Sequence, residues 1–199
     1  MISTRLLTPF GKGLLYKIHN LRINGRMFRW IRDFLSNRSF QVRVGLSLSS
    51  VFHLDEGIPQ GSSLSPTLIN IMINDVASHS RQHSKILLFA DDVAVLTRCI
   101  NVAHAGEKLQ ADIGLVEQWA LIWWFKLLGD KSKFIILSLQ KRMGDTLMVV
   151  NGTSLKVSSE VSFLGIVFDK GLTWSPHVKK LSARCVKGLN LLRCISGTE

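Results

Sequence analysis

The sequence has few cysteines and no long apolar run, and both shortages exclude classes of protein. Its three cysteines, Cys99, Cys185 and Cys194, have neither the number nor the spacing of a disulfide framework or a zinc site. No apolar stretch approaches the roughly 18 to 20 residues of a membrane span, and no apolar segment near the N-terminus precedes a small-residue cleavage site. We therefore expect neither a membrane helix nor a secretory signal, and an intracellular location in the nucleus or the cytoplasm.

Acidic residues are also scarce, 14 against 25 basic ones, for a formal net charge of +11. Residues 1–54 carry a net +8, residues 55–169 carry −2 and residues 170–199 carry +5. This layout suits a protein that holds a phosphate backbone at two basic ends and keeps carboxylates free between them. Basic residues that merely cover solvated helix faces would explain the same charges equally well, and an acidic membrane surface is another anionic partner.

The remaining composition is that of a folded protein, with 46% hydrophobic and 20% charged residues in a chain of 199. Apolar residues at helical spacing predict helices over residues 14–21, 27–35, 65–76 and 101–128, and again after Pro176. Alternating or short apolar runs predict strands over residues 40–44, 51–54, 86–90, 93–96, 133–139, 147–150, 154–157 and 161–168. The order of these elements predicts an α+β fold in which helices pack on one face of a sheet.

Local signals mark where some of these elements begin and turn. Ser65 followed by Pro66 predicts a helix start, with the serine as N-cap and the proline at the first helical position. The dipeptide Asn151-Gly152 between two apolar runs predicts a tight hairpin turn. Gly45 and the serines that follow it predict that the two strands around them pair as a second hairpin.

The segment Phe89-Ala90-Asp91-Asp92 places two adjacent carboxylates at the tip of an otherwise apolar hairpin. Mg²⁺ prefers oxygen ligands, and phosphoryl transfer with two metal ions needs carboxylates on a rigid support between the ions. Two buried strands would provide that support. An isolated pair of acids at a tight turn more often serves solubility alone, so the pair needs a second motif beside it.

That second motif lies about thirty residues upstream, where residues 59–66 read PQGSSLSP. Residues 89–92 resemble the F/Y-x-D-D signature of reverse transcriptases, and the octapeptide resembles the PQGSxLSP loop of the non-LTR enzymes, jockey-like and LINE-type. A Gly-Ser turn before a capped helix would explain its last two residues but not the whole octapeptide. The resemblance implies that Asp91 and Asp92 are catalytic metal ligands, and that Gln60 and Gly61 contact the nucleotide and the template base.

Two weaker motifs follow in the order that the family requires. Residues 124–133 resemble its W-G-L-K-x-N-x-x-K-T/S segment, although Phe125 replaces the glycine and Leu128 the asparagine. The resemblance implies that Lys131 contacts the phosphates of the nucleotide, and a solvated lysine is an equal alternative. Residues 162–166 resemble the F/Y-L-G-I/V strand, which implies that Leu164 and Gly165 lie on the primer side.

The resemblance implies a fold, a cofactor and partners. The fold is the α+β polymerase palm, an antiparallel sheet with helices on one face, accompanied by partial fingers and the start of the thumb. Residues 1–55 would form the partial fingers and palm helices with a hairpin, residues 56–170 the palm with the catalytic hairpin, and residues 171–199 the start of the thumb helix. The cofactor would be Mg²⁺, with Mn²⁺ as an alternative. The partners would be an RNA template, a DNA primer and deoxynucleoside triphosphates, with no membrane.

One element of the family pattern is missing from this sequence. The pattern places a first catalytic aspartate at Met1 and an A-F-D triplet over Arg5-Leu6-Leu7, and no acidic residue precedes Asp33. We therefore expect an RNA-directed DNA polymerase fragment of a mobile element with little or no activity alone. A non-catalytic nucleic-acid-binding remnant is the alternative, and a translated fossil that aggregates through exposed apolar edges is a third reading.

Overall fold

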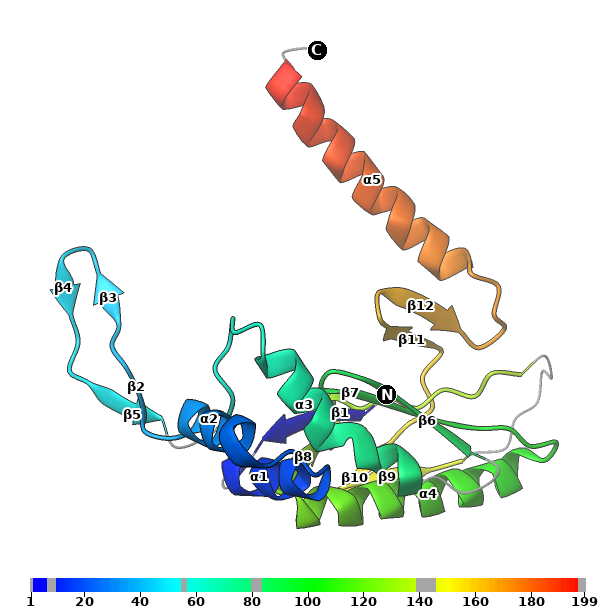
Figure 1. The fold of residues 1–199 in the computed structure, drawn as a ribbon. Helices are drawn as coiled ribbons and strands as arrows, with labels where there is room; N and C mark the ends of the chain where they lie inside the picture. The colour runs from blue at the N-terminus through cyan, green and yellow to red at the C-terminus, as the bar shows by residue number, and fades with distance from the viewer. Residues whose placement is uncertain (1, 7–9, 55–56, 80–83, 139–145, 197–199) are drawn as a thin grey trace.

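A four-stranded antiparallel sheet forms the centre of the structure, with the strand order β6-β7-β1-β8. The structure is a computed structural model that describes residues 2–6, 10–54, 57–79, 84–138 and 146–196 (Figure 1). The strands are β6 (Ser84–Phe89), β7 (Asp92–Thr97), β1 (Ile2–Leu6) and β8 (Phe125–Leu128). The N-terminal strand β1 therefore lies inside the sheet, although no strand was predicted there.

The helices are α1 (Phe10–Asn20), α2 (Gly25–Leu35), α3 (Ser65–Ile73), α4 (Val102–Ile122) and α5 (Ser175–Ser196). Two 3-10 helices, η1 (Asn74–His79) and η2 (Gly129–Lys131), follow α3 and β8. The long helix α4 contacts β6, β7 and β8 and lies along the lower side of the sheet in Figure 1. Its apolar stripe, which the 3.6-residue period predicted, thus supplies one wall of the core.

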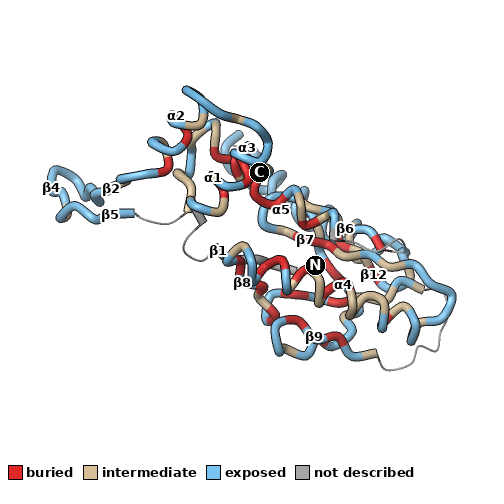
Figure 2. The backbone as a smooth tube through the Cα atoms, turned by 60° about the horizontal axis from the view of Figure 1, so that its bottom comes forward, coloured by how far each residue is buried: buried red, intermediate tan, exposed pale blue. Residues whose placement is uncertain are grey.

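Three hairpins complete the described chain. The first combines β2 (Arg38–Phe40), β3 (Arg43–Val44), β4 (Ser47–Leu48) and β5 (Phe52–Leu54), and it extends away from the buried centre (Figure 2). The second pairs β9 (Met148–Val150) with β10 (Thr153–Leu155), and the third pairs β11 (Glu160–Phe163) with β12 (Ile166–Asp169). These helices and antiparallel sheets confirm the α+β part of the predicted fold class.

A buried charge joins the helices to one another. Lys17 on α1 is 8% exposed, and its Nζ lies 2.5 Å from the Asp75 carboxylate on η1. Trp119 on α4 donates from Nε1 to the same carboxylate at 2.9 Å, and the Lys17 ammonium lies 3.9 Å from a ring centroid of Trp123. One ion pair with its aromatic neighbours therefore links α1, η1 and α4, because a buried charge needs such partners.

Several predicted elements are confirmed. The two early helices, the hairpin beyond them, the strands around the aspartate pair and the last helix all form at the expected places. The Asn151-Gly152 turn also forms, with φ of 47° and 75°, which is the left-handed backbone that a two-residue hairpin turn requires.

Three other predictions are wrong in detail. The helix predicted to reach residue 128 ends at Ile122, because Trp124 adopts a φ of 62° and the chain then enters β8. The strand predicted over residues 133–139 is reduced to an isolated bridge between Phe134 and Val157 within its described part, 133–138. The single strand predicted over residues 161–168 is instead the β11–β12 hairpin, since the chain reverses at Leu164 and Gly165.

None of the helices in the described part of the chain has the length and apolar content that crossing a membrane requires.

Candidate active site

The two adjacent aspartates lie at the turn between β6 and β7, as predicted. The ladder runs without a break from Ser84 opposite Thr97 to Phe89 opposite Asp92. Ala90 closes the turn with a φ of 50°, a left-handed conformation that costs a non-glycine residue roughly 1–2 kcal/mol. Asp91 is exposed and Asp92 is half-buried, so both carboxylates stand at the end of a paired hairpin within reach of solvent.

The central strand β1 passes beside this turn. Ser3 lies opposite Asp92 and Ile2 lies opposite Val93 in the antiparallel ladder. Met1 and Leu7, where the family pattern has acidic residues, lie outside the described residues. Over the described ranges, no group of three or more His, Cys, Asp or Glu side chains is placed to hold a metal ion. Carboxylate oxygens are ligands that hard cations such as Mg²⁺ prefer, so Asp91 and Asp92 are the residues at this turn that could hold one.

The loop before α3 is shaped by glycines and closed by a serine. Gly57 and Gly61 adopt φ of 73° and 85°, and at Gly61 the backbone rather than a lack of space demands glycine, because an added Cβ would meet nothing within 4 Å. Ser65 donates from Oγ to the Pro59 carbonyl at 2.5 Å. The prediction that Ser65 is the N-cap is wrong, since it is the first helical residue and Leu64 holds the cap position.

The tip of this loop is exposed to solvent. Gln60 and Gly61 are both exposed, and Arg38 at the base of the first hairpin donates to the Gly57 carbonyl at 2.9 Å. The loop is thus anchored at both ends while its centre is open. In Figure 1 it rises on the side of the molecule opposite α4.

Lys131 is exposed at the end of η2, directly after β8. Its position depends on Gly129, where an added Cβ would lie 2.4 Å from Thr153 Cβ and 2.9 Å from the Val150 carbonyl oxygen. Ser132 closes the turn with a 2.7 Å hydrogen bond from Oγ to the Leu128 carbonyl. Lys131 thus directly follows the edge strand β8, and β1 alone separates β8 from β7, the strand that begins with Asp92.

The turn of the β11–β12 hairpin carries Leu164 and Gly165, with φ of 49° and 83°. Between this hairpin and β7 lies an apolar cavity of about 670 Å³, whose walls include Val95, Phe163 and Phe168. The sequence did not reveal this cavity, because its walls come from segments that are distant along the chain. The structure thus places the aspartates at the β6–β7 turn and Lys131 on η2, directly after β8 of the same sheet, whereas the other predicted residues lie on two separate turns.

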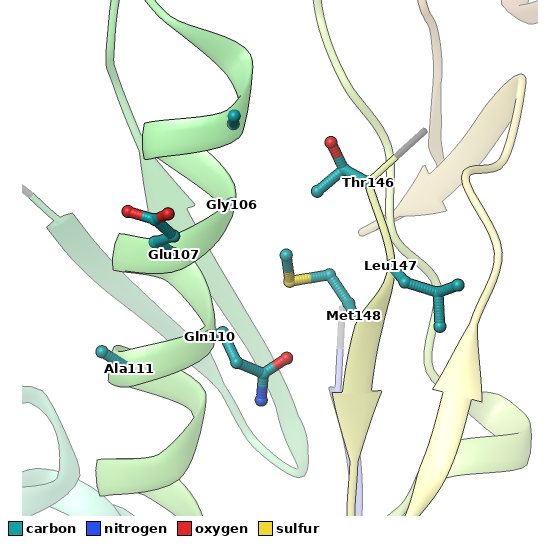
Figure 3. Close-up of a pocket in the computed structure, with 8 residues that line it drawn as sticks. Gly106, Glu107, Gln110, Ala111, Thr146, Leu147 and Met148 are labelled. Carbon is teal, nitrogen blue, oxygen red and sulfur yellow. The ribbon is translucent and has the colours of Figure 1, made fainter. Parts of the chain in front are cut away.

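A second hollow lies between α4 and β9, where a side chain of α4 holds the β9–β10 hairpin (Figure 3). Gln110 points from α4 toward β9, donates from Nε2 to the Val149 carbonyl at 3.0 Å and accepts from the Val149 N–H at 2.8 Å. Its amide thereby occupies the place of a neighbouring strand. Met148 points toward α4, while Leu147 points away. The sequence does not predict this role of Gln110, because nothing in the pattern of α4 distinguishes it from the other polar residues of the helix.

The link between β12 and α5 is held by one carboxylate. Asp169 accepts hydrogen bonds from the Thr173 N–H at 3.1 Å, the Thr173 hydroxyl at 3.0 Å and the Trp174 N–H at 3.0 Å. The backbone hydrogen bond from Thr173 and the further bonds in this turn hold the pKa of Asp169 below its ordinary value despite burial. Trp174 also packs on Phe168 with ring centroids 5.5 Å apart, so α5 leaves the hairpin in a defined direction.

The antiparallel sheet with two adjacent carboxylates at a hairpin turn suggests that the protein is a polymerase, and the family comparison agrees. The chain belongs to the reverse transcriptase (RNA-dependent DNA polymerase) family, whose model matches residues 12–168. By family it is a nucleotidyltransferase domain of a non-LTR retrotransposon.

Its curated relatives come from mobile elements of flies. It is 30% identical to the RNA-directed DNA polymerase from mobile element jockey of Drosophila funebris over 85% of this chain and 19% of that protein. It is 32% identical to the probable RNA-directed DNA polymerase from transposon BS of Drosophila melanogaster over 91% of this chain and 21% of that protein. The chain therefore spans about a fifth of the length of the curated relatives that it matches.

Proposed function

We propose that this chain is the palm of a reverse transcriptase, in which Asp91 and Asp92 bind Mg²⁺, or Mn²⁺, for RNA-directed DNA synthesis. The observation that carries the proposal is the aspartate pair at the tip of a fully laddered hairpin, in a chain of this family. Residues 1–55 would supply partial fingers, residues 56–170 the palm and residues 171–199 the start of the thumb.

The other residues of the proposal act on substrate. Gln60 and Gly61 contact the incoming nucleotide and the template base, which the exposed tip of their loop supports. Lys131 places its ammonium near the nucleotide phosphates and holds a proton for the leaving pyrophosphate. Leu164 and Gly165 support the primer strand from the β11–β12 turn.

The carboxylates act by position. Asp91 and Asp92 concentrate negative charge at a turn that the β6–β7 ladder keeps in place. When bound there, a divalent cation would offset the negative charge of the nucleotide's phosphate oxygens and favour deprotonation of the attacking hydroxyl. A rigid support matters because misplacement of reacting groups by about 1 Å can cost roughly a hundredfold in rate.

We further propose that residues 1–199 alone synthesise little DNA. Over the described residues no third acidic side chain joins the pair, so the second cation and the primer hydroxyl would be poorly held. The loss should amount to several orders of magnitude in rate. Template RNA, primer and deoxynucleoside triphosphates are nonetheless the substrates that this family implies.

The proposal is tested on the chain itself by Mn²⁺ or Mg²⁺ binding, followed by electron paramagnetic resonance or calorimetry. Asp91→Asn and Asp92→Asn should each weaken binding about tenfold or more, because each removes a charged oxygen ligand. Glu107→Gln on α4 is the matched control, since it removes an exposed carboxylate elsewhere. Unchanged binding in both aspartate variants would remove the basis of the site. Robust primer extension on RNA by the wild-type chain, abolished by Asp91→Asn, would instead disprove the predicted inactivity.

A second candidate function is nucleic-acid binding without catalysis. It is favoured by α5, which has no buried residue and carries five basic side chains: Lys179, Lys180, Arg184, Lys187 and Arg193. Such a helix suits contacts with a phosphate backbone. Salt-dependent RNA binding, with no metal binding at the aspartates, would favour this function over the polymerase.

A further inference from the structure

One face of α2 combines two arginines with an exposed tryptophan. Arg26, Arg29 and Trp30 follow one another at helical spacing and are all exposed, whereas Ile31 and Leu35 on the opposite side are buried. Residues three and four positions apart lie side by side on a helix surface. We call these three residues the α2 arginine–tryptophan face.

The tryptophan is held in place although it faces solvent. Trp30 is 55% exposed, and its ring stacks on Phe34 with centroids 5.9 Å apart and an interplanar angle of 17°. Such support leaves part of a flat aromatic surface available without further ordering. An exposed aromatic ring of this kind suits stacking with another planar group.

The charge around the face is net positive. Asp33 is the single acid between residues 10 and 54; it lies four positions after Arg29 on the same side of α2, and its carboxylate is paired with Arg32 at 3.1 Å. In the described ranges no acidic side chain forms an ion pair with Arg26 or Arg29. Arg26 and Arg29 form no ion pair of their own within this described part of the chain, so two guanidinium groups beside an aromatic ring favour an anionic partner that also has planar groups.

We propose that the α2 arginine–tryptophan face binds a single-stranded nucleic acid, with a base stacked on Trp30 and phosphates contacted by Arg26 and Arg29. An unpaired strand fits better than a duplex because a base inside a helix cannot present its face to an aromatic side chain. The inference goes beyond the proposed polymerase function, since the face lies outside the aspartate turn and requires no metal ion.

The test measures binding of fluorescein-labelled 12-nucleotide RNA and DNA strands to the full chain in EDTA, where polymerase activity cannot contribute. Trp30→Ala should weaken binding about tenfold, in line with the value of a base-aromatic stack. Arg26→Gln with Arg29→Gln should weaken it as well and reduce the slope of log affinity against log salt by about 1.4. Trp30→Phe should keep most of the affinity while losing part of the tryptophan quenching that accompanies binding.

A matched control separates the face from general charge. Lys126→Gln with Lys156→Gln removes two exposed charges at positions outside α2 and should change the affinity and the salt slope less than the arginine pair does. Equal losses in the control, unchanged binding in Trp30→Ala, or equal affinity for a blunt duplex would each overturn the proposal. A face used by a protein partner would leave strand binding unchanged in Trp30→Ala. Comparison of the RNA and DNA strands shows which sugar the face accepts.

Discussion

The ammonium of Lys17 lies 2.5 Å from the Asp75 carboxylate, within a helical layer where Lys17 itself is 8% exposed. Burial lowers the pKa of Lys17, and the hydrogen bond and negative charge of Asp75 oppose that shift. The two partners differ in surroundings, because the Asp75 side chain is 40% exposed. Substitution of Lys17 and substitution of Asp75 should therefore change the free energy of unfolding by different amounts.

Asp75→Ala should lower the free energy of unfolding by about 3 kcal/mol, because it leaves a buried ammonium and the Trp119 indole without their carboxylate. Lys17→Met should cost less, about 1 kcal/mol, since methionine fills the space and Asp75 retains access to water. Urea titration of both variants measures the difference. A larger loss in Lys17→Met would show that the ion pair is not limited by desolvation of the lysine.

The same pair predicts a pH dependence. The pKa of Lys17 is lowered from 10.5 in the folded chain, so between that lowered pKa and 10.5 the unfolded chain binds more protons. The free energy of unfolding should rise with pH through this window, because the cost of burying the charge is relieved. Urea titrations at several alkaline pH values should show the rise in the wild type and a flatter profile in Lys17→Met. Parallel profiles would contradict the assignment.

Gly129 should be far less replaceable than Gly114. A Cβ at Gly129 would lie 2.4 Å from Thr153 Cβ and close to backbone, so Gly129→Ala should destabilise the chain by about 1–3 kcal/mol. A Cβ at Gly114 in α4 would meet nothing within 4 Å, and Gly114→Ala should add about 0.5–1 kcal/mol through helix propensity. Thermal unfolding compares the two. Similar effects would mean that β10 can move away from η2.

Asp169 should make the base of α5 sensitive to acid. Hydrogen bonds from Thr173 and Trp174 lower its pKa, so its contribution to stability is complete above the ordinary value of 3.8 and disappears as pH falls through the lowered value. Asp169→Ala should destabilise the chain at neutral pH and reduce this acid dependence, whereas Asp169→Asn should retain part of the turn. Urea unfolding at several acidic pH values, followed by tryptophan fluorescence that includes Trp174, measures the effect of both substitutions. An unchanged acid profile in Asp169→Ala would assign the dependence to another carboxylate.

The sequence predicts the local part of this fold well. The aspartate hairpin follows from two short apolar runs around residues 91 and 92, and the Asn151-Gly152 turn follows from backbone preferences alone. Both depend on residues that are neighbours along the chain. Periodic apolar residues also locate α4, whose stripe matches the side that it buries.

The sequence does not predict features that depend on residues far apart along the chain. The helical spacing of apolar residues continues through residues 123–128. The positive φ of Trp124 nevertheless turns the chain, and β8 then pairs with β1. No local sequence pattern predicts that β1 is its partner. The positive φ of Leu164 likewise converts a predicted strand into a hairpin. For the candidate site, the aspartates follow from the sequence, while the neighbouring Ser3 and the cavity beside β7 required the sheet order.

The position of β1 between β7 and β8 has a consequence for how the chain folds. Strand β1 pairs with residues around positions 92 and 125 to 128, which lie much further along the chain. Contacts of such long sequence separation form slowly, because a long loop must close before they contribute. During that delay β7 and β8 have no strand between them, so the carboxylate hairpin should acquire its final neighbour in the last steps of folding.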